Sequence, residues 1–174
     1  MNYFELFAMP VTFKTDKKYL QEKYFELQKK CHPDFFSNDS EQEQEDALEK
    51  SSLVNKGYKT FQNDDDTIGY VLQLKGLLEE EEKYALSPDF LMEMMELNEG
   101  LADGESPTIE ETRVKIDQFQ KKLYDKVQNI IEYYNEDNTT NEQLLQVKDY
   151  YFKKKYLNRI LERLEGMRNI APSL

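Results

Sequence analysis

The sequence predicts an all-α protein, with an antiparallel helical hairpin and short flanking helices in its N-terminal part and a three-helix bundle in its C-terminal part. Glycine and proline are scarce, at 6 and 5 of 174 residues. Residues that favour helices, such as Lys, Glu, Leu and Gln, are plentiful instead. Apolar residues also recur every three or four positions along several long segments, which is the spacing of one face of a helix.

Two helices are predicted before residue 32. The first is short, docks its aromatic side chains on a neighbour and is closed by Pro10. Its apolar cluster comprises Tyr3, Phe4, Leu6 and Phe7. The second follows Asp16, a suitable N-cap, and its apolar face comprises Leu20, Tyr24, Leu27 and Cys31. Its other sides carry Lys17, Lys18, Lys23, Lys29 and Lys30, which usually means a solvated face but stands out in an acidic protein.

The second helix is expected to end at an exposed turn. Pro33 has no backbone N–H, and it drives His32 out of the helical conformation. The helix should therefore stop at Cys31, and the tripeptide His32-Pro33-Asp34 should form a rigid, charged turn between two helices. Such a turn suits display to another molecule better than burial.

A third helix is predicted after the turn, because Ser40 and Glu43 have the spacing of a capping box. Its apolar face is thin and uses small residues, so that another helix can approach it closely. The residues expected on this face are Ala47, Leu48, Ser51, Ser52, Asn55, Tyr58 and Phe61. The polar run 63–67 is expected to break the pattern, and a further apolar segment, 68–74, is stopped by Gly76.

A domain boundary is predicted in the segment 76–88, where a run of glutamates leads to a Ser-Pro stop. We expect one domain over 1–75 and a three-helix bundle over 89–174. Its helices should span about 89–101, 109–135 and 142–167, joined by short turns. The second helix carries the stripe Ile116, Phe119, Leu123, Val127, Ile130 and Tyr134. The third carries Leu144, Val147, Tyr151, Leu157, Leu161 and Leu164.

Composition and charge exclude several classes of function. The formal net charge is −12 and the sequence pI about 4.7, so general nucleic-acid binding, which needs clustered Lys and Arg, is not expected. A single cysteine excludes an internal disulfide and a Cys-rich zinc module. No apolar run is as long as a membrane span, and the start resembles neither a secretory signal nor a transit peptide. We therefore expect a soluble cytoplasmic protein that binds neither nucleic acid nor membrane.

Catalysis and metal binding are not expected either. His32 is the only histidine and Cys31 the only cysteine, so a metal site built from several such ligands is not available. Adjacent side chains at the end of a helix point apart, so these two do not form a catalytic pair. Cys31 also continues the apolar face of its helix, and we interpret it as a packed core thiol. The chain is therefore expected to be no enzyme and to hold no cofactor.

The first helix of the bundle has more apolar residues than folding needs. At about 100° per residue, its core face comprises Phe90, Met94, Leu97 and Leu101. Leu91, Met92 and Met95 form a second stripe, flanked by Glu96 and Glu99. Either the neighbouring helices bury this stripe too, or it is a partner surface, for which methionine is well suited. The two carboxylates favour exposure, because carboxylates are seldom fully buried.

The apolar stripe of the last helix is interrupted by the run Lys153-Lys154-Lys155 and by Tyr156. Such residues usually form a solvated face with a partly buried aromatic ring. They could equally extend a contact surface.

The N-terminal part resembles a J-domain. The resemblance rests on the order of a short helix, a lysine-rich helix, His32-Pro33-Asp34, and a helix with Ser51, Asn55 and Tyr58. Nearly the whole chain is similar to HscB, the co-chaperone family of iron–sulfur cluster assembly. The motifs that carry this similarity are Tyr3-Phe4-Glu5-Leu6-Phe7, Phe25-x-Leu27-Gln28 before the tripeptide, Tyr70-x-Leu72-x-Leu74-x-Gly76 and Phe90-Leu91-Met92-Glu93-x-Met95-Glu96-Leu97-x-Glu99.

The resemblance implies a co-chaperone with two contact surfaces. In this family the J-domain stimulates ATP hydrolysis by a DnaK-class chaperone, HscA in many bacteria, and the C-terminal bundle binds the scaffold protein IscU. The chaperone-binding positions map to His32, Pro33, Asp34, Lys23, Lys29 and Lys30. The scaffold-binding positions map to Leu91, Met92, Met95, Glu96, Glu99 and Tyr156, and thus include the second stripe.

Three positions depart from the family pattern. Phe35 follows the tripeptide where J-domains commonly carry Lys, Thr67 stands where the family has Arg, and Tyr156 replaces the usual Phe. Two alternatives stay open. One is a J-domain protein with a different client, and the other is a structural helical adaptor in which the tripeptide is a chance turn.

Overall fold

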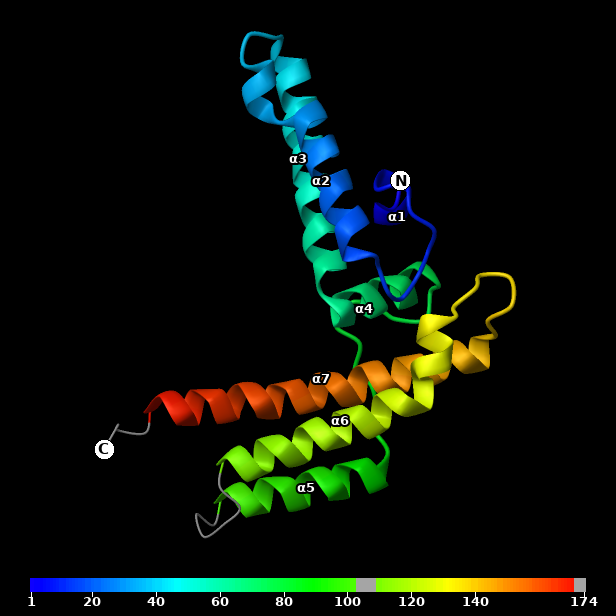
Figure 1. Ribbon diagram of the computed structural model, residues 1–174, viewed down its shortest axis with the longest axis vertical. Coiled ribbons are helices and arrows are strands. Elements are labelled where there is room, and N and C mark those ends of the chain that lie inside the picture. Colours follow the sequence, from blue (N-terminus) through cyan, green and yellow to red (C-terminus); the bar gives the residue numbers. More distant parts are fainter. Residues whose placement is uncertain (103–108, 171–174) are drawn as a thin grey trace. The chain divides into compact units, whose positions relative to one another are not determined.

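The computed structural model describes residues 1–102 and 109–170, which form helices and loops and no strand (Figure 1). The predicted all-α class is confirmed. The elements are α1 (Tyr3–Leu6), α2 (Lys17–Cys31), the 3₁₀ turn η1 (Pro33–Phe36), α3 (Glu41–Gln62), α4 (Asp64–Leu74), α5 (Pro88–Ala102), α6 (Ile109–Glu132) and α7 (Asn141–Ile170). They belong to two compact units, residues 1–76 with 134–138, and residues 77–133 with the chain from 139 onward.

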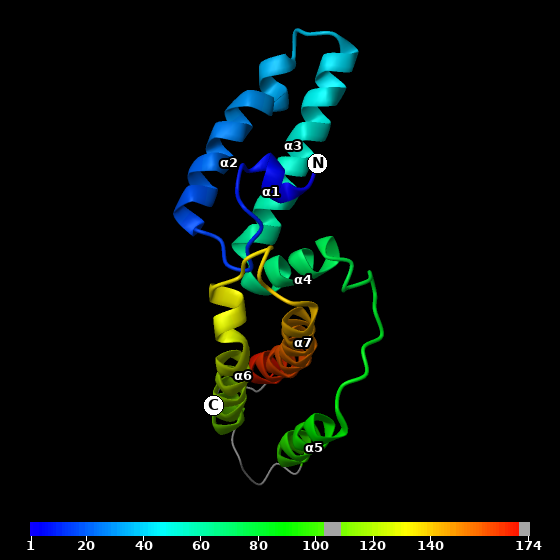
Figure 2. The same ribbon diagram turned by 90° about the vertical axis from the view of Figure 1, so that its right-hand side faces the viewer.

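In the first unit, α2 and α3 form an antiparallel hairpin (Figure 1 and Figure 2). Asp16 caps α2, because its Oδ1 accepts hydrogen bonds from two backbone N–H groups of the first turn at 2.9 and 3.1 Å. Ser40 and Glu43 form the reciprocal capping box that begins α3. The helix α2 ends at Cys31, as predicted from Pro33. Local sequence signals therefore set both ends of the loop that joins the two helices.

The core of the first unit is an aromatic cluster around Phe61, whose side chain is fully buried. The ring centroids of Phe4 and Phe7 lie 4.6 and 5.8 Å from that of Phe61, and the centroid of Tyr70 in α4 lies 6.0 Å away. Each ring of this kind removes about 150–250 Å² of surface from water. The aromatic residues of α1 therefore dock on α3 and α4, as the sequence predicts.

The short helix α1 can approach α3 closely because α3 carries no side chain at Gly57. A Cβ atom at this position would lie 2.9 Å from Cε2 of Phe7 and 3.2 Å from Cγ of Tyr3. Distances below about 3 Å to a ring carbon require the ring to move. Phe7 is fully buried, so its ring has no space into which to move.

The thin face of α3 is confirmed in character, although its position around the helix differs from the predicted one. The buried residues are Ala47, Ser51, Val54, Gly57 and Phe61. Three of the residues predicted there, Leu48, Ser52 and Asn55, are exposed instead. They lie one position further along than 47, 51 and 54, and so about 100° around the helix from the face that the rest of the unit covers.

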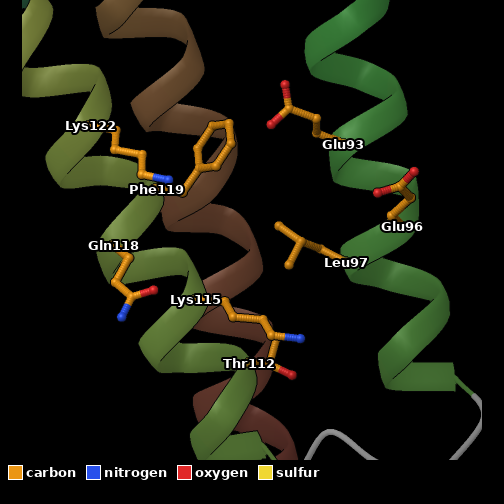
Figure 3. Close-up of a pocket in the computed structure, with 8 residues that line it drawn as sticks. All are labelled: Glu93, Glu96, Leu97, Thr112, Lys115, Gln118, Phe119 and Lys122. Carbon is orange, nitrogen blue, oxygen red and sulfur yellow. The ribbon is translucent and has the colours of Figure 1, made fainter.

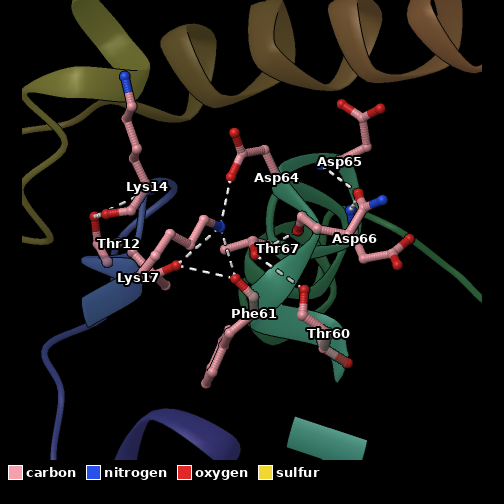
Figure 4. A network of polar contacts seen from close by, with 11 residues as sticks. Thr12, Lys14, Lys17, Thr60, Phe61, Asp64, Asp65, Asp66 and Thr67 are labelled. Carbon is pink, nitrogen blue, oxygen red and sulfur yellow. Dashed lines mark hydrogen bonds and ion pairs between the residues drawn. The ribbon is translucent and has the colours of Figure 1, made fainter. Parts of the chain in front are cut away.

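A polar cluster holds the junction of α3 and α4 (Figure 4). The Nζ of Lys17 donates to the backbone carbonyl of Phe61 at 2.8 Å and to Oδ1 of Asp64 at 2.7 Å. Thr15 donates to the same carbonyl at 3.0 Å. The hydroxyl of the buried Thr67 donates to two further carbonyls of this turn, at 3.1 and 2.8 Å. The bonds from Lys17 and Thr15 satisfy the Phe61 carbonyl, which the end of α3 leaves without a helical partner.

The prediction that residues 63–67 break the helical pattern is wrong for all but Asn63. This residue is extended, and it is both the C-cap of α3 and the N-cap of α4. Its Oδ1 accepts from the N–H groups of Asp65 and Asp66 at 2.9 and 3.1 Å. Acidic residues in a first turn interact favourably with the helix dipole, so the aspartate run begins a helix instead of ending one.

In the second unit, α6 packs on both α5 and α7. The buried residues of α6 are Thr112, Ile116, Leu123, Val127 and Ile131. Those of α7 within the described side chains are Leu144, Val147, Tyr150, Leu157, Ile160 and Leu164. Three positions differ by one residue from the predicted stripes, since Ile131, Tyr150 and Ile160 are buried in place of Ile130, Tyr151 and Leu161. Two adjacent residues can lie on either side of the centre of the apolar face, because a helix has 3.6 residues per turn. Which of the two is buried depends on how the helix packs against its neighbours.

The predicted extension of the second bundle helix to residue 135 is also wrong. The helix α6 ends at Glu132. Tyr134 lies beyond it and packs its ring edge-on against Phe13 in the first unit, with 4.9 Å between the centroids. Tyr134 fits the helical spacing of α6, but its ring packs in the first unit and not in the core of the bundle.

The irregular segment 77–87 is fixed on α7 within the second unit. The ring of Tyr84 stacks on Phe152 with 4.5 Å between centroids, and its hydroxyl donates to Asp149 at 2.9 Å. Burial and the Asp149 carboxylate raise the pKa of Tyr84 to about 12. Lys148 lies 2.8 Å from a carboxylate oxygen of Glu82. The functional domain limits at 75 and 89 stay a prediction.

Replacing Gly57 by alanine should destabilise the protein, although alanine favours a helix over glycine by about 1 kcal/mol. The new methyl group would press on the buried ring of Phe7, and overpacking of this kind costs about 1–3 kcal/mol. We expect a lower midpoint in thermal or urea unfolding. Gly166→Ala is the matched control, because nothing lies within 4 Å of its added Cβ and it should stabilise α7. Equal effects of the two variants would contradict the close approach.

Candidate functional site

The tripeptide forms an exposed turn between α2 and α3. His32 is extended, with φ −65° and ψ 128°, and Pro33–Phe36 follows as one 3₁₀ turn. The Nδ1 of His32 accepts a hydrogen bond from the backbone N–H of Asp34 at 3.3 Å. The histidine ring and the fixed φ of Pro33 together hold the backbone of Asp34.

The turn presents a carboxylate beside an apolar ring. The side chain of Asp34 is 85% exposed, and its Oδ2 lies 3.6 Å from Nδ1 of His32. Phe35 is 69% exposed, and its ring meets that of His32 edge-on with 6.1 Å between centroids. A partner that approaches the turn therefore meets an anion and an aromatic face together.

The predicted basic face of α2 is partly neutralised by Glu26. Its two carboxylate oxygens lie 3.0 Å from Nζ of Lys23 and 2.6 Å from Nζ of Lys30. Lys29 is exposed and has no ion pair among the described residues. Three lysines and one glutamate give the stretch 23–30 of α2, which leads to the turn, two net positive charges. The sequence signal for Glu26 is its position three residues after Lys23 and four before Lys30, where helical side chains meet.

Polar contacts join α2 to α3 along the hairpin. The ring of Tyr24 stacks on that of Tyr58 with 4.0 Å between centroids. The hydroxyl of Tyr24 and the side-chain amide of Gln28 both donate to Oδ1 of Asn55, at 3.0 and 2.7 Å. Ser51 donates to Oε1 of Gln28 at 3.4 Å. The three α3 residues that carry the J-domain resemblance thus hold the two helices in register.

The second apolar stripe of α5 is exposed. Its members Leu91, Met92 and Met95 have exposed fractions of 38%, 62% and 61%. Glu96 and Glu99 beside them are exposed as well. The alternative in which neighbouring helices bury this stripe is therefore wrong, because the helix is buried on only one face.

Tyr156 lies half-buried on α7 and contacts α5 through Phe90. The two rings meet edge-on with 5.8 Å between centroids. The Nζ of Lys153 lies 5.7 Å from the centroid of the same Phe90 ring, in cation–π geometry. Because Phe90 directly precedes Leu91, these contacts bring α7 to the start of the exposed stripe.

Each set of predicted contact residues lies within one unit. The chaperone-binding positions belong to the first unit, and the scaffold-binding positions to the second. The side chain of Leu101, predicted for the core face of α5, lies outside the described residues.

Cys31 is a buried thiol in the structure. It is 6% exposed, and its Sγ donates to the backbone carbonyl of Leu27 at 3.1 Å. Burial raises the pKa of this thiol and so opposes formation of the nucleophilic thiolate. Across residues 1–102 and 109–170, no three His, Cys, Asp or Glu side chains are grouped so that they could hold a metal ion. None of the helices in these ranges is long and apolar enough to cross a membrane.

Known proteins resemble this chain in sequence and in fold. Residues 86–165 match the family described as the HSCB C-terminal oligomerisation domain. The co-chaperone protein HscB of Buchnera aphidicola subsp. Acyrthosiphon pisum (strain Tuc7) is 39% identical over 133 residues, which cover 76% of this chain and 71% of that protein. The iron-sulfur cluster co-chaperone protein HscB of Mus musculus is 37% identical over 133 residues, covering 75% of this chain and 57% of the mouse protein.

The crystal structure of the human co-chaperone protein HscB has a similar fold. It matches with a TM-score of 0.82 and 31% identity, over 99% of this chain and 84% of the human chain. The match therefore includes both units of the described structure.

The ion pairs of Glu26 should persist far into the acid range. Hydrogen bonds from Lys30 and then Lys23 lower the pKa of Glu26 from 4.5 to about 2. A depressed carboxyl pKa gives stability that is present above pH 4.5 and is lost as the pH falls through about 2. Carbon-13 NMR of the side-chain carboxyl should show this midpoint. In a Lys23→Gln/Lys30→Gln variant the midpoint should return toward 4.5, and a wild-type midpoint near 4.5 would contradict the pairing.

Proposed function

The chain belongs to the HscB family of co-chaperones of iron–sulfur cluster assembly, and we propose that it stimulates ATP hydrolysis by a DnaK-class, HscA-like chaperone and delivers an IscU-like scaffold protein to it. In this proposal the chain makes and breaks no covalent bond. It acts in the cytoplasm as an adaptor, with the turn of the first unit for the chaperone and the stripe of the second for the scaffold.

The observation that carries the proposal is the presentation of Asp34. A carboxylate that is 85% exposed has no role in the core of the hairpin. Its backbone is nevertheless held on both sides, by the ring of His32 and by the fixed geometry of Pro33. A charged group that is exposed and yet held in one geometry is suited to binding a cationic group on a partner.

Asp34 would act on the chaperone by shifting a conformational equilibrium. An adaptor accelerates ATP hydrolysis if it binds the hydrolysis-competent state of the chaperone more tightly than the other state. A charge-assisted hydrogen bond that Asp34 makes in one state only would supply such a difference. Phe35 offers an apolar contact where other J-domains commonly offer the charge of a lysine.

The lysines of α2 would steer the chaperone toward the turn. Opposite charges raise the rate of encounter and fix the orientation of the two proteins more than they raise affinity. After pairing with Glu26, the group of Lys23, Lys29 and Lys30 keeps two net positive charges beside the turn. The complementary surface on the chaperone should therefore be acidic.

The exposed stripe of α5 would bind the scaffold protein. Three large apolar side chains in a row along one helix are typical of a contact surface, and methionine adapts its shape to a partner. Glu96 and Glu99 at the rim would contact basic side chains of the scaffold. Tyr156, which packs on Phe90, would extend the surface onto α7.

Asp34→Asn should abolish most of the stimulation while leaving the fold intact. Loss of one charge-assisted hydrogen bond to a partner costs about 1.5–3 kcal/mol, so we expect roughly a 10- to 100-fold loss of stimulation. The measurement is the steady-state ATPase rate of a purified DnaK-class chaperone with and without the variant. Asp39→Asn is the matched control, because it removes the same charge from an exposed position in the nearby loop. Unchanged stimulation by the Asp34 variant would remove Asp34 from the proposal.

Replacing Leu91, Met92 and Met95 together by alanine should weaken binding of the scaffold protein. A central apolar contact of this kind contributes about 2 kcal/mol or more, so a loss of at least about 30-fold in affinity is expected. Calorimetric titration with an IscU-like scaffold protein measures it, and circular dichroism checks the fold.

Leu145→Ala is the control for a general loss of exposed apolar surface, since Leu145 is 49% exposed on α7. If the triple variant binds the scaffold as tightly as the wild type while chaperone stimulation depends on Asp34, the protein is a J-domain adaptor for another client. If stimulation is absent altogether, a structural helical adaptor is the remaining interpretation.

A further inference from the structure

A pocket of about 360 Å³ lies between α5 and α6 in the second unit (Figure 3). Glu93, Glu96 and Leu97 line it from α5. Thr112, Lys115 and Phe119 are among the residues that line it from α6. None of the α6 residues belongs to the predicted chaperone or scaffold surfaces.

The wall of this pocket contains a polar group without a partner. The side chain of Thr112 is buried, with 1% exposure, and its Oγ1 has no hydrogen-bond partner among the residues that the structure describes. Buried hydroxyl groups are nearly always hydrogen-bonded, because leaving one unpaired is costly. Figure 3 shows the Thr112 hydroxyl on the side of α6 that faces α5. A ligand in the pocket could therefore supply the missing partner.

The two walls of the pocket carry opposite charges. Glu93 and Glu96 stand on the α5 wall, and Lys115 and Lys122 on the α6 wall. No ion pair joins the walls within the described residues. A ligand with a single kind of charge would be attracted by one wall and repelled by the other. The pocket thus favours a ligand that carries a basic and an acidic group side by side, as a peptide segment does.

The pocket adjoins the exposed stripe through Glu96. At about 100° per residue, Glu96 lies roughly 40° around α5 from Met92 on one side and roughly 60° from Glu93 on the other. The apolar stripe, Glu96 and the pocket therefore follow one another around the same helix. A protein bound to the stripe has its own chain beside the mouth of the pocket.

We propose that the pocket between α5 and α6 is a second binding site for the scaffold protein, and that it receives a segment with adjacent basic and acidic side chains. The basic side chain binds Glu93 and Glu96, and the acidic one binds Lys115 and Lys122. A polar group of the segment pairs with the hydroxyl of Thr112. This inference rests on the proposed function, because it takes the partner of the neighbouring stripe to be the scaffold.

The first test removes the positive wall. Lys115→Gln/Lys122→Gln should weaken binding of a purified IscU-like scaffold protein by about tenfold, since two charge contacts are lost. The control Lys121→Gln/Lys126→Gln changes the net charge by the same amount on the same helix, outside this pocket, and should keep the affinity within about twofold. Equal affinity losses in both variants, or none in either, would overturn the inference.

The second test uses Thr112→Val, which keeps the shape of the side chain and removes the hydroxyl. Removal of a buried, unpaired hydroxyl should raise the midpoint of thermal unfolding. The same change should lower scaffold affinity by about threefold to tenfold, because the segment loses its partner. A purely structural role for Thr112 would change stability without changing affinity, and that result would contradict the proposal.

A third variant separates this inference from the proposed function. If Leu91→Ala/Met92→Ala/Met95→Ala leaves scaffold affinity unchanged, the assignment of the scaffold to the second unit fails, and the inference fails with it. If that variant weakens binding and Lys115→Gln/Lys122→Gln does not, only the inference is overturned. If the lysines instead paired with the glutamates of the opposite wall, Lys115→Gln/Lys122→Gln would lower the stability of the protein and leave its affinity for the scaffold unchanged. That result would also overturn the inference.

Discussion

Burial of Phe61 is the interaction on which the first unit depends. Its ring is the point where α1, α3 and α4 meet, and a helix as short as α1 is not stable on its own. Lys17 binds the backbone carbonyl of the same residue, so aromatic packing and helix capping fix one end of the hairpin together. The turn η1 joins α2 and α3 at the other end of the hairpin (Figure 1). Its position therefore follows from the lengths and caps of α2 and α3, and the side chains of Asp34 and Phe35 in it are exposed.

Sequence analysis could predict the features that depend on local chemistry. The cap at Asp16, the capping box at Ser40 and the end of α2 before Pro33 each need only neighbouring residues, and each is found where it is expected. Features that depend on the packed neighbour could not be predicted. Tyr134 fits the stripe of α6 by spacing but packs in the other unit. For the α5 stripe the flanking carboxylates favoured exposure, but only the packed bundle decides which face of α5 is covered. The pairing of Glu26 was accessible to sequence analysis from its helical spacing.

Charge in this protein acts locally. The net charge is −12, yet the face of α2 beside the turn is positive. Screening limits exposed charges to a range of about 8 Å at physiological ionic strength, so a partner at the turn responds to nearby groups and not to the total. Charges of opposite sign also lie close together in the second unit. Glu93 and Lys115 line opposite walls of one pocket, and no ion pair joins these walls in the described structure. The face of α2 and the pocket between α5 and α6 thus each have an electrostatic character that the net charge does not indicate.

The absence of a side chain at Gly57 also constrains how the sequence can vary. Any larger residue at this position conflicts with Phe7, so the two positions cannot change independently. An alanine at 57 becomes acceptable only after the ring at 7 has been replaced by a smaller side chain, and that first replacement leaves a gap beside Phe61. The order of substitutions therefore matters along any mutational path through this core. Among related sequences, the residues at positions 7 and 57 should therefore vary together.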